Sequence, residues 1–284
     1  MIRPLTLAGI IFSLAGSLAA QAPSVATGGV TNSASFAKDS SGHGSAMAPG
    51  SLVTIFGAFP GATLADADTV PFSTSLGGAS VTFNGIAAPV RDVNPGGAFP
   101  IINAQLPFEV MNGLNGATTV PVVVTINKVQ SAPQQIPVAA IAPGIFTIPE
   151  GVGVAVLVNL TDFSVAAPTN ANLGVPSRPI KPGEQAYMYV TGLGAMTPPI
   201  ADGAADLVTT HTANSTPIVW IGGVNTGVMA PVIFAGQAPS YPGVNQINLM
   251  IPQNAPTGNA VQIQIQSADG TMVSPANVAT IAIQ

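Results

Sequence analysis

Cysteine is absent from this sequence of 284 residues. Its absence excludes disulfides, thiolate metal ligands and a cysteine nucleophile, so stability has to come from the hydrophobic core. Charge is also scarce, because Asp, Glu, Lys and Arg together make up 6% of the residues, against about 25% in an average globular protein. The formal net charge is −5 and no basic run occurs, which makes nucleic acid a poor candidate partner.

Long apolar runs are missing beyond the N-terminus, although hydrophobic residues make up 47% of the chain. A spanning helix needs roughly 18 or more consecutive apolar residues, so we expect no transmembrane segment after residue 20. Residues 1–20 have the three parts of a secretory signal peptide: a positive charge at Arg3, an apolar stretch over 5–14, and small residues over 17–20. The sequence therefore predicts an exported protein, secreted or held at the cell surface.

Glycine and proline are abundant, with 31 and 27 residues respectively. They interrupt the chain into short runs rich in Val, Ile and Thr, and such spacing is typical of β-sandwiches and disfavours long helices. Alternation is clearest over 262–266, where every second residue is apolar. We expect an all-β protein.

An internal repeat organises these runs. Each copy has a Pro-Gly pair before an alternating strand that ends near a glycine, then a hairpin with a tight two-residue turn, at 84–85 and at 222–223. An Ile-Asn strand ending at proline and two further strands follow. The aligned markers are Pro49/Pro182, Gly57/Gly192, Gly85/Gly223 and Pro107/Pro252. Upstream, 30–32 and 157–159 each end a short apolar run at asparagine. The repeat predicts two tandem immunoglobulin-like sandwiches, over 21–147 and 148–284, with 21–47 as a polar, partly flexible leading segment.

These motifs, taken in order, resemble the IPT/TIG class of immunoglobulin-like domain. More closely, the chain from about residue 30 resembles the Solibacter-type uncharacterised C-terminal domain family. The segments that carry the resemblance are 30–36, 48–51, 75–78, 142–147 and 191–194. The resemblance implies a secreted, surface-associated protein without an assigned activity. In that family the unit commonly ends a longer chain, whereas here it directly follows the expected signal peptide.

Paired acidic residues in two loops are weak candidates for calcium binding: Asp66 with Asp68, and Asp202 with Asp206. Calcium takes several oxygen ligands and often bridges extracellular domains. Neither pair has the regular Asp-x-Asp-x-Asp-Gly order with a closing Glu, so solvated loop carboxylates are the favoured interpretation.

Catalytic patterns are not found. His43 and His211 are expected in flexible polar loops, without a serine elbow or clustered metal ligands. Tyr187 and Tyr189 share one sheet face and are interpreted as core or domain-interface aromatics, with a sugar platform as the less favoured alternative. Tyr241 is the candidate for an exposed ligand contact. We expect no cofactor and no enzymatic activity.

Three functions remain open. The first is a non-enzymatic structural or interaction protein of the cell exterior, serving as a spacer, adhesin or matrix component with an extracellular protein or polysaccharide as partner. The second is a carbohydrate-binding module. The third is a self-assembling surface subunit that exchanges an edge strand with a neighbouring copy.

Overall fold

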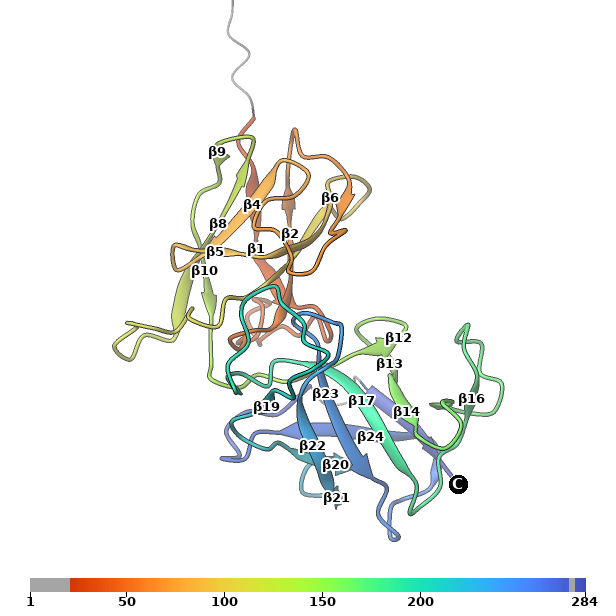
Figure 1. Cartoon of the computed structure of the whole chain (residues 1–284). Helices are drawn as coiled ribbons and strands as arrows, with labels where there is room; N and C mark the ends of the chain where they lie inside the picture. The colour runs from red at the N-terminus through yellow and green to blue at the C-terminus, as the bar shows by residue number, and fades with distance from the viewer. Residues whose placement is uncertain (1–20, 276–278) are drawn as a thin grey trace, which may run out of the picture.

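The computed structural model describes residues 21–275 and 279–284, and the expected signal peptide at 1–20 lies outside them. Over the described ranges the chain folds into strands, turns and loops, without a helix (Figure 1). This confirms the predicted all-β class. Within the same ranges there is accordingly no helix long and apolar enough to cross a membrane.

The strands form two lobes (Figure 1). We call the part containing β1 to β10 the N-terminal lobe, and the part containing β11 to β25 the C-terminal lobe. In the N-terminal lobe, one sheet has the order β1(Ser24–Asn32), β2(Leu52–Ala58), β7(Ile101–Gln105), β6(Val90–Asn94), β3(Ala65–Asp66). Its other sheet has the order β10(Gln134–Pro137), β8(Thr119–Ile126), β4(Ala79–Phe83), β5(Ile86–Ala88), with β9(Val129–Gln130) paired to β8.

The C-terminal lobe has a larger and a smaller sheet. The larger has the order β16(Ser177–Arg178), β15(Val165–Ala166), β14(Leu157–Asn159), β17(Gln185–Thr191), β23(Asn245–Met250), β22(Val232–Gln237), β19(Thr212–Ala213), β18(Met196–Thr197), with β11(Gly144–Ile145) paired to β17. The smaller has the order β12(Thr147–Ile148), β13(Gly153–Ala155), β25(Ala279–Ile283), β24(Gly258–Gln266), β20(Ile218–Ile221), β21(Val228–Ala230).

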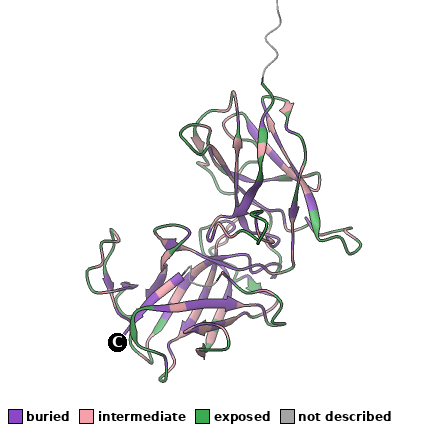
Figure 2. Ribbon diagram, turned by 180° about the vertical axis from the view of Figure 1, so that it is seen from behind, coloured by how far each residue is buried: buried purple, intermediate pink, exposed green. Residues whose placement is uncertain are grey.

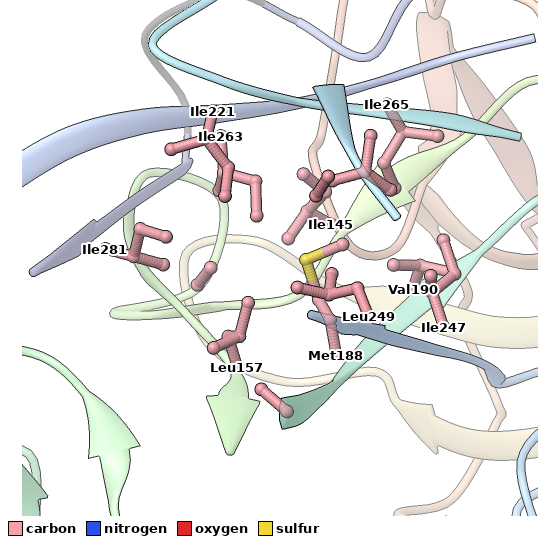
Figure 3. Packing of buried hydrophobic residues seen from close by; sticks show 14 of the residues in the cluster. Ile145, Leu157, Met188, Val190, Ile221, Ile247, Leu249, Ile263, Ile265 and Ile281 are labelled. Carbon is pink, nitrogen blue, oxygen red and sulfur yellow. The ribbon is translucent and has the colours of Figure 1, made fainter. Parts of the chain in front are cut away.

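Each lobe has its own hydrophobic core, to which both of its sheets contribute. In the N-terminal lobe, Ile55 and Ile102 from one sheet join Val81 and Val124 from the other. In the C-terminal lobe, side chains of the larger sheet meet isoleucines of the smaller one, as Figure 3 shows for Met188, Leu249, Ile263 and Ile281. Buried residues concentrate along the strands of each lobe (Figure 2). Two sheets that close on one core are consistent with a β-sandwich.

The repeat has the same backbone pairing in both lobes. Gly50 N–H donates to the carbonyl of Leu106, and Gly183 N–H donates in the same way to the carbonyl of Ile251, both at 2.8 Å. The strands that follow pair alike, with Leu52 opposite Gln105 and Gln185 opposite Met250. The predicted equivalence of the Pro-Gly strands and the Ile-Asn strands is thus present in the hydrogen bonding.

Two details of the predicted repeat are wrong. The alignment of Gly57 with Gly192 is out by two residues, because the strand register makes Val190 the counterpart of Gly57. The hairpin after Ile221 has no tight two-residue turn, and its return strand begins only at Val228. Gly222 and Gly223 both have positive φ, and the hydroxyl of Thr226 donates to the carbonyl of Gly222 at 2.8 Å. This bond closes a wider turn.

The hairpin at Asn84 and Gly85 has the predicted two-residue turn. Both residues have positive φ, at 52° and 77°, as a type I′ turn requires. The strands on either side pair directly, with Phe83 opposite Ile86.

Each lobe also has an equivalent corner after its first apolar run. Phe36 N–H donates to the Asn32 carbonyl, and Phe163 N–H donates to the Asn159 carbonyl, both at 2.9 Å. Both phenylalanines have positive φ, 47° and 58°. We call these the N-terminal corner (residues 32–36) and the C-terminal corner (residues 159–163).

Residues just before the predicted domain boundary at 147/148 already pair with the C-terminal lobe. Gly144 and Ile145 precede that boundary, yet they pair with Thr191 and Val190 of β17. Ile145 is 2% exposed and belongs to the core of the C-terminal lobe. The leading segment 21–47 contributes β1, which pairs with β2.

Candidate functional site

The two lobes are joined by a loop of the C-terminal lobe, residues 201–204, that reaches the N-terminal lobe. Phe72 N–H donates to the carbonyl of Gly203 at 2.9 Å, and Gly203 N–H donates to Oε1 of the buried Gln105. Phe108 N–H donates to Oδ1 of Asp202 at 2.9 Å. These bonds come from two separate segments of the N-terminal lobe, around Phe72 and over 105–108, and fix the position of the loop.

Thr191 makes a second connection. Its buried hydroxyl accepts the Leu52 N–H at 2.9 Å and donates to the carbonyl of Gly243 at 2.7 Å. A single hydroxyl therefore satisfies a donor of one lobe and an acceptor of the other. Since these groups are buried, each would lose a hydrogen bond without gaining water if the hydroxyl were removed.

Glycines allow the backbones of the two lobes to approach at this junction. At Gly203, φ is +71° and an added Cβ would lie 3.0 Å from both the N and O atoms of Phe72. At Gly243, φ is +72° and an added Cβ would lie 2.8 Å from Cδ2 of Leu52. Each site therefore favours glycine both for its backbone conformation and for lack of space.

An open cleft of about 490 Å³ lies between the lobes next to this junction. Its volume falls within the range of ~300–1,000 Å³ usual for small-ligand sites. The N-terminal lobe contributes Leu52, Val70, Phe72 and Arg91, and the C-terminal lobe contributes Phe146, Glu150, Val156, Tyr189, Ser240, Tyr241, Pro242 and Val244. The lining is mainly apolar and aromatic, with one residue of each charge sign.

The tyrosines form a connected row that reaches the cleft. Tyr187 and Tyr189 have ring centroids 5.3 Å apart, and Tyr189 and Tyr241 have theirs 6.0 Å apart, both edge-to-face. This geometry is favourable for aromatic pairs. Burial raises the pKa of Tyr189 to about 12, with smaller contributions from Tyr187 and Tyr241, so its phenol is neutral at any physiological pH.

Tyr187 and Tyr189 have different surroundings, since Tyr187 packs against a small buried cluster of Val158, Val165 and Ala167. The core is formed by the alternating residues Ala186, Met188 and Val190, all fully buried, so the tyrosines are on the opposite face of β17. Tyr189 lines the cleft between the lobes and is an interface aromatic. Tyr241, expected to be exposed, is 54% exposed and lines the same cleft.

Charged residues flank the aromatic lining. Arg91 and Glu150 line the cleft from opposite lobes. Next to Arg91, the Asp92 carboxylate lies 3.8 Å from the Arg91 Nε and accepts a hydrogen bond from the Asn103 amide at 2.8 Å. Burial raises the pKa of Asp92, and the bond from Asn103 and the charge of Arg91 partly oppose this shift. The guanidinium of Arg91 offers hydrogen-bond donors on one wall of the cleft, and the carboxylate of Glu150 offers acceptors on the other.

The four candidate calcium ligands have different surroundings. Asp66 is an exposed residue of β3 opposite Asp92, and Asp68 is exposed. Asp202 belongs to the interlobe junction, where burial raises its pKa and the Phe108 N–H bond opposes the rise. Asp206 accepts the N–H groups of Val208 and Thr209, which hold its pKa well below the usual range.

Metal-ligating residues do not gather elsewhere in the ranges 21–275 and 279–284. No three residues among His, Cys, Asp and Glu converge there in a way that could hold a metal ion. The carboxylate at position 202 is instead engaged by a backbone N–H of the other lobe.

The histidines differ from each other. His43 is exposed, in a turn where its N–H donates to Asp39. His211 lies in a loop, as predicted, but it is only 6% exposed. Its Nδ1 lies 2.7 Å from the Pro198 carbonyl and its Nε2 lies 3.3 Å from Asp206. Because a carbonyl only accepts, Nδ1 carries a hydrogen, and the ring ties two loop segments together.

Sequence reasoning missed several residues of the junction and cleft, namely Phe72, Arg91, Glu150, Thr191 and Gly203. For two other residues of the junction, a comparison of the two repeat copies could have indicated the contact between the lobes. Position 52 has leucine while its repeat counterpart 185 has glutamine, and position 108 has phenylalanine while 253 has glutamine. An apolar residue in one copy and a polar one in the other marks a surface that is covered in only one lobe.

Comparison with known proteins adds no family to these observations, because no family model matches the chain and no curated protein has a significantly similar sequence.

Proposed function

We propose that this is an exported, non-catalytic interaction protein of the cell exterior. It consists of two immunoglobulin-like sandwiches docked as one unit, and it binds its ligand in the interlobe cleft. The observation that carries this proposal is a cleft with aromatic walls, built from both lobes and lying next to a junction held by buried hydrogen bonds. A cleft fixed in this way costs little ordering on binding.

The non-catalytic part of the proposal is supported by the way the polar side chains are used. Asp202 and His211 are engaged in contacts between chain segments. Arg91 and Glu150 are the charged residues among those that line the cleft, and neither is a nucleophile paired with a base. Recognition, rather than bond cleavage, is what such a lining supports.

The test uses the exported protein and a variant with a filled cleft. Val70 lines the cleft and is 51% exposed, so V70W adds bulk inside it without disturbing the core. Val208 is 94% exposed and does not line this cleft, so V208W is the matched control. Binding to cell envelopes of the producing organism is measured by co-sedimentation. We expect binding by the wild type and V208W and its loss in V70W; a protein that stays inside the cell, or equal binding by all three, would contradict the proposal.

A further inference from the structure

The cleft indicates the chemical class of its ligand, and this inference rests on the proposed function. Tyr241 is 54% exposed as a residue, and its ring packs edge-to-face against that of Tyr189. A braced ring is held in place before a ligand arrives, so little side-chain entropy is lost on binding. Phe72 of the N-terminal lobe and Phe146 of the C-terminal lobe also line the cleft.

Flat aromatic faces suit a ligand that is itself amphipathic. Sugar rings carry C–H groups on their faces and hydroxyl groups around their edges. The C–H faces pack on aromatic rings, whose π faces are negative, while the hydroxyl groups need hydrogen-bond donors and acceptors. In the cleft, the guanidinium of Arg91 can only donate and the carboxylate of Glu150 can only accept. A hydroxyl group can satisfy either of them.

The balance of charge favours a neutral ligand over a charged one. Arg91 contributes one positive charge and Glu150 one negative charge, from opposite walls. These two charges balance, so neither an anion nor a cation gains a net attraction from the charged residues of the lining. The Asp92 carboxylate, 3.8 Å from the Arg91 Nε, further weakens the attraction of Arg91 for an anion. Tyr189 adds no charge, because its pKa is raised to about 12.

We propose that the interlobe cleft binds a neutral oligosaccharide segment, stacked on Tyr241 and hydrogen-bonded by Arg91 and Glu150. The volume of about 490 Å³ gives room for a short segment rather than a single small ion. The cleft is open enough to leave Tyr241 half exposed, so a longer polymer can enter without threading.

The experiment measures affinity for defined probes by isothermal titration calorimetry. The neutral probes are oligosaccharides of cellulose, xylan, mannan, starch and chitin, and the charged probes are oligogalacturonate and chitosan oligomers. We expect at least one neutral series to bind. Replacement of the stacked ring in Y241A is expected to weaken that binding about tenfold or more, as for a central aromatic contact.

Two further variants distinguish a loss of stacking at Tyr241 from an effect of charge and from a general effect of the substitution on folding. Phe99 is 77% exposed and does not line the cleft, so F99A is the matched aromatic control and is expected to bind as the wild type does. The E150Q variant removes the charge but keeps a hydrogen-bonding group, so it should weaken binding of the neutral probe less than Y241A does; a charged ligand would instead respond by the sign of its charge, an anion binding more tightly and a cation more weakly. Thermal unfolding of each variant checks that it is folded.

Three outcomes overturn the proposal: no neutral probe binds, a charged probe binds more tightly than all neutral ones, or Y241A binds as well as the wild type. Its failure can be told apart from failure of the proposed function by treating the cell envelopes with protease. If binding to envelopes depends on the cleft but disappears after proteolysis, the ligand is a protein. The oligosaccharide assignment is then wrong while the interaction function stands.

Discussion

The N-terminal corner and the C-terminal corner share their backbone hydrogen bonds but have different surroundings. Ser33 N–H donates to the Leu52 carbonyl in one lobe, and Leu160 N–H donates to the Gln185 carbonyl in the other. At the N-terminal corner, Leu52 is 2% exposed and its N–H is bonded to Thr191 of the C-terminal lobe. At the C-terminal corner the counterpart Gln185 is exposed.

Side chains around the two corners follow the same contrast. Phe108 packs against the core of the other lobe, while its counterpart Gln253 is exposed. The Ser51 hydroxyl donates to the nearby Ala48 carbonyl, while the carboxylate of its counterpart Glu184 accepts two hydrogen bonds from Arg178, at 2.8 and 2.9 Å.

The ion pairs at the C-terminal corner form a small network. Arg178 also donates to Asp162 at 2.6 Å, and the Asn159 amide donates to Glu184 at 2.8 Å. Hydrogen bonds from Ser164 and Arg178 lower the pKa of Asp162 to about 2. The same backbone corner thus forms part of the interlobe joint in the first lobe and carries a partly exposed ionic cluster in the second. Within a repeat, the side chains alone decide whether a corner docks or faces solvent.

Removal of the Thr191 hydroxyl should give the largest loss, because it breaks the joint at its most buried point. In T191V, the Leu52 N–H and the Gly243 carbonyl both lose their partner. At about 1–3 kcal/mol for each buried unsatisfied group, we expect unfolding to be easier by roughly 2–4 kcal/mol, measured by urea denaturation. T118V, at an exposed position, is the control and should stay near the wild type. A loss no larger than that of T118V would show that the joint does not depend on this hydroxyl.

Addition of a methyl group at Gly203 should push the lobes apart while leaving each core intact. Gly174 is the matched control, since it has a similar positive φ of +74° but nothing within 4 Å of an added Cβ. Both alanine variants pay the cost of the left-handed backbone, so their difference isolates the contact with Phe72. We expect G203A to be less stable than G174A by about 1–3 kcal/mol, with faster hydrogen exchange at the Phe72 and Phe108 amides. Equal stability and unchanged exchange would mean that the loop accommodates the methyl group.

Neutralisation of Glu184 tests the ionic corner and should have the smallest effect. The hydrogen bonds from Arg178 lower the pKa of Glu184 below its usual 4.5, so its contribution is fully present above that pH and is lost as the pH falls through the lowered pKa. We expect E184Q to lose about 1 kcal/mol at pH 7 and less as the pH falls below 4. Denaturation at a series of pH values measures this. The exposed Asp68 supplies the control D68N, and an E184Q deficit that does not shrink in acid would contradict the ionic account.

The strands and their pairing could be predicted from the sequence, whereas the contacts that join the two lobes could not. The Pro-Gly pairs and the Ile-Asn strands were found because alternation and turn residues are local signals, and the same pairing appears in both copies. The turn after Ile221 was misjudged, since a Gly-Gly pair allows several turns and the Thr226 hydroxyl selects a wider one.

The junction and the cleft depend on partners far apart in the chain. Leu52 and Thr191 are 139 residues apart, and Gln105 and Gly203 are 98 apart. No local pattern predicts such pairs, because they arise only after both sheets have folded. Tyr241 could be singled out from its loop position, whereas Phe72 and Arg91 gain their place in the cleft only through docking.

The shared walls of the cleft also link occupancy to folding. Since the lining comes from both lobes, a ligand can bind there only while the lobes are docked. By thermodynamic linkage, a bound ligand raises the free energy needed to open the junction by RT ln(1 + [L]/Kd). At a ligand concentration of about 100 times Kd this amounts to about 2.7 kcal/mol, comparable with what the Thr191 hydroxyl contributes. The occupied protein therefore resists separation of its lobes, and any partner that pulls them apart also releases the ligand.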